Sequence, residues 1–182
     1  MATDATPSSG GSTRATAPAG LVKKLFHRSC RRGKQLRLDG SRPVEVEEET
    51  NYLQSDVIGA LGNQLKWCIT KQYSFRETSH INSQELRAIK KEVTDWARTG
   101  NDSIRGNIHC GLCDLAVAIG VVNNGRSSSY KLNGILRSML CNMIVTGSTI
   151  ALNYINTHFN PADYPSRGAP LPTEMTGSAA VP

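Results

Sequence analysis

The middle of the 182-residue chain alternates between helical and strand-like hydrophobic patterns, and this alternation limits the folds open to it. The expected elements are, in order, a helix over 82–98, a strand over 107–113, helices beginning at Asp114 and near Ser129, a strand over 149–155 and a short helix beginning at Asn160-Pro161. Helices that alternate with buried strands are typical of α/β domains. The apolar positions of the third helix, from Leu132 to Ile144, follow a helical stripe and are expected in the core.

The segment before these elements predicts that the sheet is mixed. Residues 65–75 alternate loosely between apolar and polar side chains, which indicates a strand of a hairpin rather than of a βαβ unit. Residues 52–61 suggest a short helix or an irregular packed segment. We therefore expect one α/β domain over residues 51–168, with a mixed sheet flanked by helices and with its N-terminal strands unassigned.

Both ends of the chain have little to bury. Residues 1–20 are almost entirely Ala, Thr, Ser, Gly and Pro, and the sequence predicts that they are disordered. Residues 21–50 form a charged segment that is basic first and acidic afterwards. Residues 169–182 contain several prolines and are expected to be a second disordered tail.

The net charge of +6 favours a partner rich in phosphate, although a merely basic protein is equally compatible with it. The densest basic run contains Lys23, Lys24, Arg28, Arg31, Arg32, Lys34 and Arg37. Of these, Lys23, Lys24, Arg31 and Arg32 are our candidates for phosphate contacts. The same run could instead pair with the acidic residues that follow it, or remain solvated.

The cysteines and the hydropathy pattern indicate a reducing, intracellular location, cytoplasmic or nuclear. The five cysteines form no regular framework of the kind that disulfide-stapled secreted domains have. No run of about 18 apolar residues is present, so no membrane partner is expected. Cys110 and Cys113 form a single Cys-x-x-Cys without a second ligand pair, so core packing is a better interpretation than a zinc site.

Three acidic residues occupy comparable places in the predicted elements. Glu85 and Asp163 lie in the first turns of helices, and Asp114 lies where a strand ends and a helix begins. Taken singly, each is best explained as a group that caps a helix N-terminus. Taken together, they could converge at the C-terminal edge of the sheet, where open α/β sheets place ligands. Converging carboxylates would suit two Mg²⁺ or Mn²⁺ ions that clamp a phosphodiester.

Four segments in order resemble the ribonuclease H domains of retroelement reverse transcriptases, in particular elements similar to the tyrosine-recombinase retrotransposons. They are His80-Ile-Asn-Ser-Gln-Glu-Leu-Arg-Ala88, Cys113-Asp-Leu-Ala-Val-Ala-Ile-Gly120, Gly125-Arg-Ser-Ser-Ser129 with Leu132-Asn133, and Asn160-Pro-Ala-Asp-Tyr-Pro-Ser-Arg167. The resemblance covers about half of the chain. It implies an α/β ribonuclease H-like fold and a detached domain, originally fused to a polymerase whose signature is absent here.

The resemblance also implies a chemistry. Glu85, Asp114 and Asp163 correspond to catalytic metal ligands, and the implied substrate is the RNA strand of an RNA–DNA hybrid. The expected activity is that of an endonuclease, a hydrolase that requires magnesium.

Two features of the family pattern have no counterpart that we identify in the sequence. A fourth carboxylate, an Asp on the first strand in an Asp-Ala-Ser-like context followed by glycines, is not assigned, because neither Asp39 nor Asp56 has that context. His158 lies too close to Asp163 to match the family's loop histidine. These departures leave an alternative open, a degenerate retroelement relic that retains the fold and nucleic-acid binding without catalysis.

The loop over residues 125–129 has properties of its own. Arg126, Ser127 and Ser128 precede a helix and offer a guanidinium, hydroxyls and backbone N–H groups to a phosphate. An N-capping serine with a solvated arginine would explain the same residues equally well. We treat the three residues as candidate nucleic-acid contacts.

Overall fold

A five-stranded mixed sheet forms the centre of the computed structural model, which describes residues 1–29, 56–99 and 106–177. Its strands are β1 (Ala2–Ala5), β2 (Ser9–Ala15), β3 (Trp67–Ser74), β4 (Ile108–Cys113) and β5 (Thr149–Tyr154). Their order is β3-β2-β1-β4-β5. The first three are antiparallel neighbours, whereas β4 runs parallel to both β1 and β5. The predicted α/β class with a mixed sheet is confirmed.

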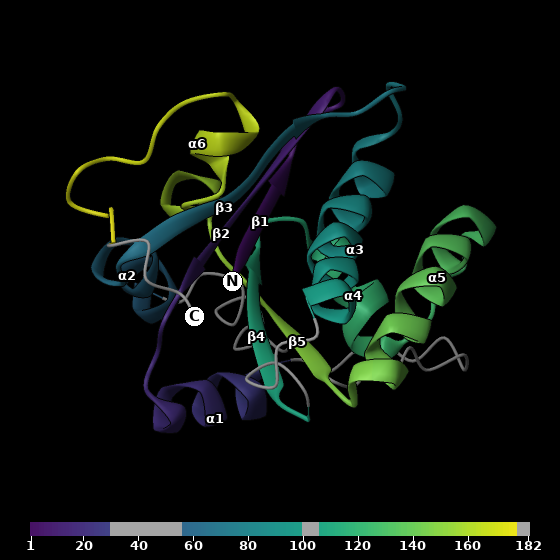
Figure 1. Ribbon diagram of the computed structural model, residues 1–182, viewed down its shortest axis with the longest axis horizontal. Coiled ribbons are helices and arrows are strands. Elements are labelled where there is room, and N and C mark those ends of the chain that lie inside the picture. The colour runs from purple at the N-terminus through teal and green to yellow at the C-terminus, as the bar shows by residue number, and fades with distance from the viewer. Residues whose placement is uncertain (30–55, 100–105, 178–182) are drawn as a thin grey trace, which may run out of the picture.

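The two N-terminal strands correct the prediction that residues 1–20 are disordered. β1 is the central strand, and β2 lies between it and β3 (Figure 1). Most residues of both strands are buried although few are hydrophobic. β2 pairs with β1 and β3 on its two sides, whereas β1 pairs with β4 only at Ala2. Side chains bond other backbone groups of β1, since Glu85 accepts from the Ala5 amide and Asn160 donates to the Thr3 carbonyl. Hydrophobicity alone therefore underestimated this segment.

Helices cover both faces of the sheet. They are α1 (Ala19–Arg28), α2 (Asp56–Gln64), α3 (Ile81–Thr99), α4 (Ala116–Asn124), α5 (Tyr130–Thr146) and α6 (Asp163–Ser166), with a short 3₁₀ turn, η2, over Thr157–Phe159. The expected helices and strands between residues 65 and 166 are present, with ends shifted by a few residues.

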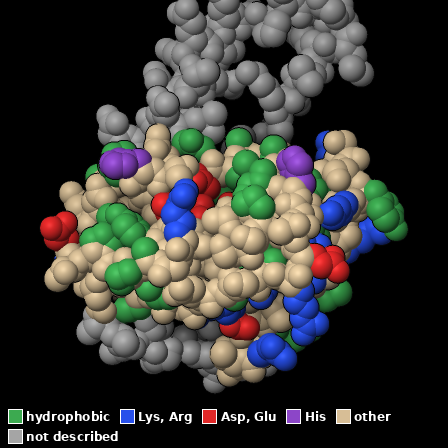
Figure 2. Space-filling view, turned by 90° about the horizontal axis from the view of Figure 1, so that it is seen from above, with side chains coloured by type: hydrophobic (Ala, Val, Ile, Leu, Met, Phe, Trp, Pro, Cys, Tyr) green, Lys and Arg blue, Asp and Glu red, His purple; other side chains and the backbone are tan. Residues whose placement is uncertain are grey.

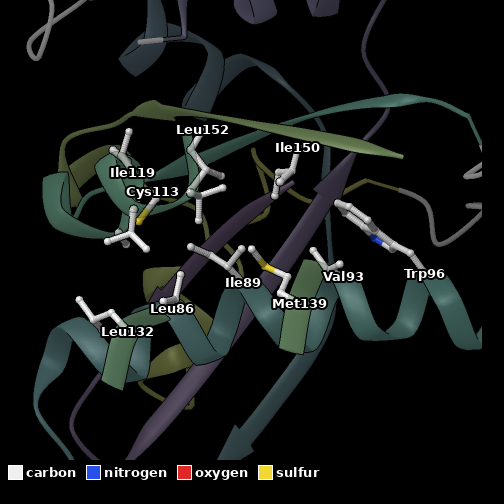
Figure 3. Packing of buried hydrophobic residues seen from close by; sticks show 13 residues of the cluster. Leu86, Ile89, Val93, Trp96, Cys113, Ile119, Leu132, Met139, Ile150 and Leu152 are labelled. Atoms are coloured by element: carbon white, nitrogen blue, oxygen red, sulfur yellow. The ribbon is translucent and has the colours of Figure 1, made fainter. Parts of the chain in front are cut away.

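Two hydrophobic clusters hold the layers together. In the first, Leu86, Ile89 and Val93 of α3 point toward Ile150 and Leu152 of β5 (Figure 3). The second packs α1 and α2 against the opposite face of the sheet through Leu25, Ile58 and Leu112, among others. Because apolar side chains meet on both faces, the central strands are removed from water on both sides.

Helix α5 differs in part from its prediction. Ser129 caps its N-terminus by accepting a hydrogen bond from the Leu132 amide, and Gly147 ends it in the left-handed region with φ 64°. Leu132 and Met139 are buried as expected. Leu140 and Ile144 are exposed, Ile144 by 70%, so the predicted core stripe was too wide.

The C-terminal segment also corrects a prediction of disorder. Residues 169–177 return to the sheet, where the Trp67 amide donates to the Met175 carbonyl at 2.7 Å and the Gly177 amide donates to the Trp67 carbonyl at 2.8 Å. The rest of this predicted tail, residues 178–182, lies outside the described residues, as does most of the charged segment, residues 30–50. Among the helices described, none has the length and apolar character needed to cross a bilayer.

Candidate metal centre

Carboxylates from two strands and two helices meet at one end of the sheet. Asp4 lies on β1 and Asp114 directly follows β4. These strands run parallel, so their C-terminal ends share an edge. Glu85 comes from the second turn of α3, and Asp163 begins α6. Figure 2 looks onto this end of the molecule, and acidic side chains are visible near the middle of that face.

Asp4 is the carboxylate that the sequence analysis did not find. It is 4% exposed and lies on the central strand of the sheet, where the Ser166 hydroxyl donates a hydrogen bond to it. The sequence carried a signal, since Asp4-Ala5-Thr6 is followed by Gly10-Gly11, an acid in an Asp-Ala-Ser-like context followed by glycines. The expectation of disorder over residues 1–20 hid this signal.

Glu85 binds the central strand rather than capping its own helix. Its Oε1 accepts a hydrogen bond from the Ala5 amide at 2.8 Å, and the residue is only 2% exposed. A capping glutamate would instead accept from an amide at the start of α3. The capping explanation therefore fails for Glu85, and its second oxygen, Oε2, is turned toward the Cys113 thiol.

Asp114 and Asp163 each have one oxygen held by a neighbouring donor. The Thr157 hydroxyl donates to Asp114 Oδ2 at 2.6 Å. The N-cap residue of α4 is Leu115, whose side chain makes no capping hydrogen bond. Arg167 Nε donates to Asp163 Oδ1 at 2.7 Å. Asp114 thus does not cap α4, although Asp163 still lies in the first turn of α6.

The segment from η2 to α6 supplies most of these donors and is tied to the N-terminal strands. Ser9 Oγ donates to the Ser166 carbonyl at 2.6 Å, and Asn160 Nδ2 donates to the Thr3 carbonyl at 3.1 Å. A side chain at Gly11 would collide with the backbone of Pro165 and Ser166. The absence of a Cβ on β2 therefore lets α6 approach the sheet and bring Asp163 to its edge.

Burial and mutual repulsion raise the pKa values of two of these acids. Burial raises the pKa of Asp4 to about 7, and the charges of Asp114 and Asp163 add to the effect despite the Ser166 hydrogen bond. Burial also raises the pKa of Glu85 to about 9, with further contributions from Asp4 and then Asp114. These charge effects indicate that Asp4 lies within electrostatic reach of the other three carboxylates.

We expect the Asp4→Asn variant to be more stable than the wild type at neutral pH. The folded-state pKa of Asp4 exceeds its unfolded value, so the folded protein binds more protons and loses stability as pH rises from about 4 to about 7. Asn carries no charge and can still accept from Ser166. The difference in unfolding free energy should be near zero at pH 4 and on the order of 2 kcal/mol at pH 8.

Urea unfolding of metal-free protein at pH 4, 6 and 8 measures this difference. A variant that is less stable than the wild type at pH 8, or a difference that does not change with pH, would show that Asp4 is not held in a repulsive cluster.

The donor set fits a magnesium-type centre. Four carboxylates offer hard oxygen ligands, and protein donors engage one oxygen each of Asp114 and Asp163 and leave the other available. Glu85 Oε1 accepts from the Ala5 amide, and its Oε2 has only the weak Cys113 thiol as a partner among the described residues. The repulsion among these buried acids is the kind that a divalent cation would relieve. Ligand atoms of Glu85, Cys113 and Asp114 lie within 4.8 Å of one another, which is close enough for shared coordination.

The structure separates the predicted basic residues into two regions. Arg126, Ser127 and Ser128 lie in the loop before α5, and the neighbouring Lys131 Nζ donates to Ser79 Oγ at 2.9 Å, just before α3. Lys23 and Lys24 lie on α1, which Figure 1 places at the end of the sheet away from α6. Arg31 and Arg32 lie outside the described residues.

Within the loop, local hydrogen bonds already use part of what it offers. The Ser127 amide donates to Asn133 Oδ1 at 2.8 Å, and Ser129 caps α5. Both residues therefore follow the capping alternative. The guanidinium of Arg126 and the hydroxyl of Ser128 lie in exposed residues.

Cys110 and Cys113 lie on opposite faces of the sheet and therefore do not share one site. Cys113 belongs to the cluster under α3, whereas Cys110 packs with the cluster on the other face, where its thiol donates to the Val22 carbonyl. His158 lies exposed in η2, beside Thr157.

Comparisons with known proteins add one structural similarity. No family model matches the chain, and no curated protein matches it. Among solved structures, it is similar to the N-terminal RNase H domain of a Mycobacterium tuberculosis protein, solved as a fusion with maltose-binding protein, with a TM-score of 0.45 and 11% identity. The match covers 56% of this chain and 76% of that one. The predicted α/β class, with a mixed sheet flanked by helices, agrees with the observed sheet and helices.

Proposed function

We propose that the chain is a ribonuclease H-like domain, derived from a retroelement reverse transcriptase, that hydrolyses the RNA strand of RNA–DNA hybrids with Mg²⁺ or Mn²⁺. The observation that carries the proposal is the position of Asp4. It adds a buried acid on the central strand to Glu85, Asp114 and Asp163, so that four carboxylates share one end of the sheet. The resemblance of the four sequence segments supports the retroelement origin.

The contacts of Asp4 connect it to its neighbours in the group. Ser166 of α6 donates to its carboxylate, and the amide of the next residue, Ala5, donates to Glu85. The donors on the protein side fix the rotamers of the acids, so little reorganisation is required when ligands arrive. Two bound Mg²⁺ ions would supply charge for the attacking and leaving oxygens of the phosphodiester.

The degenerate-relic alternative rested on two departures, the missing first-strand acid and the missing loop histidine. Asp4 answers the first, because it lies on β1 and accepts from Ser166 of α6, the helix that begins at Asp163. The second remains, since His158 lies in η2 beside Thr157.

The direct test is cleavage of an RNA–DNA hybrid by the wild type and by Asp114→Asn. The variant should lose Mg²⁺-dependent cleavage and remain folded, because Asp114 caps no helix and Asn can still accept from Thr157. Single-stranded RNA and an RNA duplex, each with and without a chelator, establish the substrate. Wild-type activity that persists in Asp114→Asn would exclude this site, and inactivity of a folded wild type would favour the relic.

We further expect hybrid binding to weaken steeply with salt, because the basic residues would make sequence-independent phosphate contacts. The log–log slope should be about −0.9 per contacted phosphate, the value for duplex DNA. Arg126→Ala should make the slope shallower by about 0.9, the value for one phosphate contact. The double variant Lys23→Ala with Lys24→Ala tests whether residues at the opposite end of the sheet also contact phosphates. Binding that does not change between about 50 and 200 mM salt would refute the phosphate contacts.

A further inference from the structure

We propose that Cys113, Glu85 and Asp114 form a site for one thiophilic divalent cation, such as Zn²⁺ or Cd²⁺. The site differs from the all-carboxylate magnesium centre in its sulfur ligand and in not requiring Asp4 or Asp163. It does not rest on the proposed nuclease function, since a cation can bind here whether or not the chain cleaves nucleic acid.

Two elements bring the ligand atoms together. Cys113 is the last residue of β4 and Asp114 directly follows it, whereas Glu85 reaches across from α3. One ligand atom from each lies within 4.8 Å of the other two, and Cys113 Sγ is 3.9 Å from Glu85 Oε2. On a tetrahedral ion with a bond of about 2.3 Å to sulfur and 2.1 Å to oxygen, such atoms are roughly 3.5 Å apart. The separations would therefore have to shorten by up to about 1.3 Å when a tetrahedral ion binds.

One backbone donor lies beside the sulfur, although burial and the charge of Glu85 raise the pKa of the Cys113 thiol, so the thiolate forms only as a cation replaces the proton. The Leu115 amide donates to Cys113 Sγ at 3.5 Å, and such an N–H stabilises a metal-bound thiolate. The Ala5 amide holds Glu85 Oε1, which leaves Oε2 turned toward the sulfur. On binding, the sulfur–metal bond forms and the thiol proton leaves to solvent.

The ligand types decide which cations this site takes. Thiolate sulfur favours zinc and similar soft or borderline ions, whereas Mg²⁺ prefers oxygen. Cys113 is fully buried in the cluster that contains Leu86 and Ile119 (Figure 3), so little water competes at the sulfur. Three protein ligands leave the fourth tetrahedral position open. Because Glu85 and Asp114 are shared, a cation held by Cys113 excludes Mg²⁺ from the same two carboxylates.

The test is a Cd²⁺ titration of the metal-free, reduced full chain, read by the ultraviolet charge-transfer absorption of a cadmium–thiolate bond. The wild type should bind one equivalent with this absorption, and Cys113→Ser should lose it. Cys141→Ser is the matched control, because Cys141 is exposed on α5 and should leave the absorption unchanged. The full wild-type absorption in a folded Cys113→Ser variant would overturn the proposal.

Glu85→Gln provides a second test that keeps the cysteine and the Ala5 hydrogen bond. Its Cd²⁺ affinity should fall at least about tenfold, and excess Mg²⁺ should weaken Cd²⁺ binding to the wild type. Unchanged affinity in Glu85→Gln would contradict the ligand set. The titration contains no substrate, so a failure of hybrid cleavage leaves its outcome untouched.

Discussion

Asp4→Asn is expected to reduce Mg²⁺-dependent cleavage of an RNA–DNA hybrid by about a thousandfold or more. Asp4 lies on the middle strand, accepts from Ser166 of α6 and directly precedes the amide that binds Glu85, so the loss of its charge affects positions that the neighbouring carboxylates share. The hydrogen bond from Ser166 can persist, and removal of the buried charge stabilises the fold at neutral pH. The variant should therefore be folded and inactive.

Asp95→Asn is the control for this experiment. Asp95 is a partly exposed acid near the end of α3, where it pairs with Lys71. Its replacement should leave cleavage within about twofold of the wild type. Cleavage by Asp4→Asn above a tenth of the wild-type rate would mean that Asp4 is not part of the site.

Glu92→Ala is expected to destabilise the fold by about 3–5 kcal/mol. The Glu92 side chain is completely buried, and its oxygens accept from Arg14 Nε at 2.9 Å and Ser12 Oγ at 2.7 Å, with Lys71 Nζ at 3.2 Å. Burial alone would raise its pKa, but the charges of Arg14 and Lys71 and the Ser12 hydrogen bond outweigh burial and lower it. Its loss leaves two cations between β2, β3 and α3 without their shared anion.

Chemical denaturation at pH 7 measures this loss against Asp95→Asn, whose surface pair with Lys71 should contribute less than about 1 kcal/mol. Since the pKa of Glu92 is lowered on folding, its contribution is present at neutral pH and disappears only in strong acid. Equal stability of Glu92→Ala and Asp95→Asn at pH 7 would show that the hydrogen bonds and ion pairs of Glu92 do not stabilise the packing of β2 and β3 against α3.

Periodicity was sufficient to predict the second half of the fold. Helix α3 shows why, because Leu86, Ile89 and Val93 recur at the spacing that buries one face of a helix. In β4, Cys110 and Leu112 alternate with residues of the other face and pack in the cluster beside α1 and α2, whereas Ile150 and Leu152 of β5 pack with α3. Such patterns can be recognised from the local sequence alone, without knowledge of the neighbouring elements.

The N-terminal strands were missed because their stability is not local. Thr3, Ser12 and Thr13 are buried only because β3 and β4 pair with both sides of the β1–β2 hairpin, and because α3 and α6 cover it. Small residues in these strands allow neighbouring elements to pack closely against the sheet, as Gly11 allows α6 to do. A composition rich in Gly, Ser and Thr indicates disorder when no such neighbours are known.

The same reason explains the partial prediction of the site. Glu85, Asp114 and Asp163 stand in distinctive segments at helix starts, so the sequence singled them out. Asp4 stands in a segment expected to be unfolded, and only the pairing of β1 with β4 places it beside Asp114. Thr157 had no sequence signal of its own, because a hydroxyl in a turn has many possible roles, and Ser166 stood in the matched segment 160–167 without an assigned role.

The most direct test of the four-carboxylate centre is a crystal structure of the chain with Mn²⁺, examined for anomalous scattering from the metal. Peaks bonded to oxygens of Asp4, Glu85, Asp114 and Asp163 at the C-terminal edge of β1 and β4 are the result that we predict. The same crystals of Asp4→Asn should have weaker peaks or none. Manganese bound elsewhere, with these four carboxylates unliganded, would contradict the account.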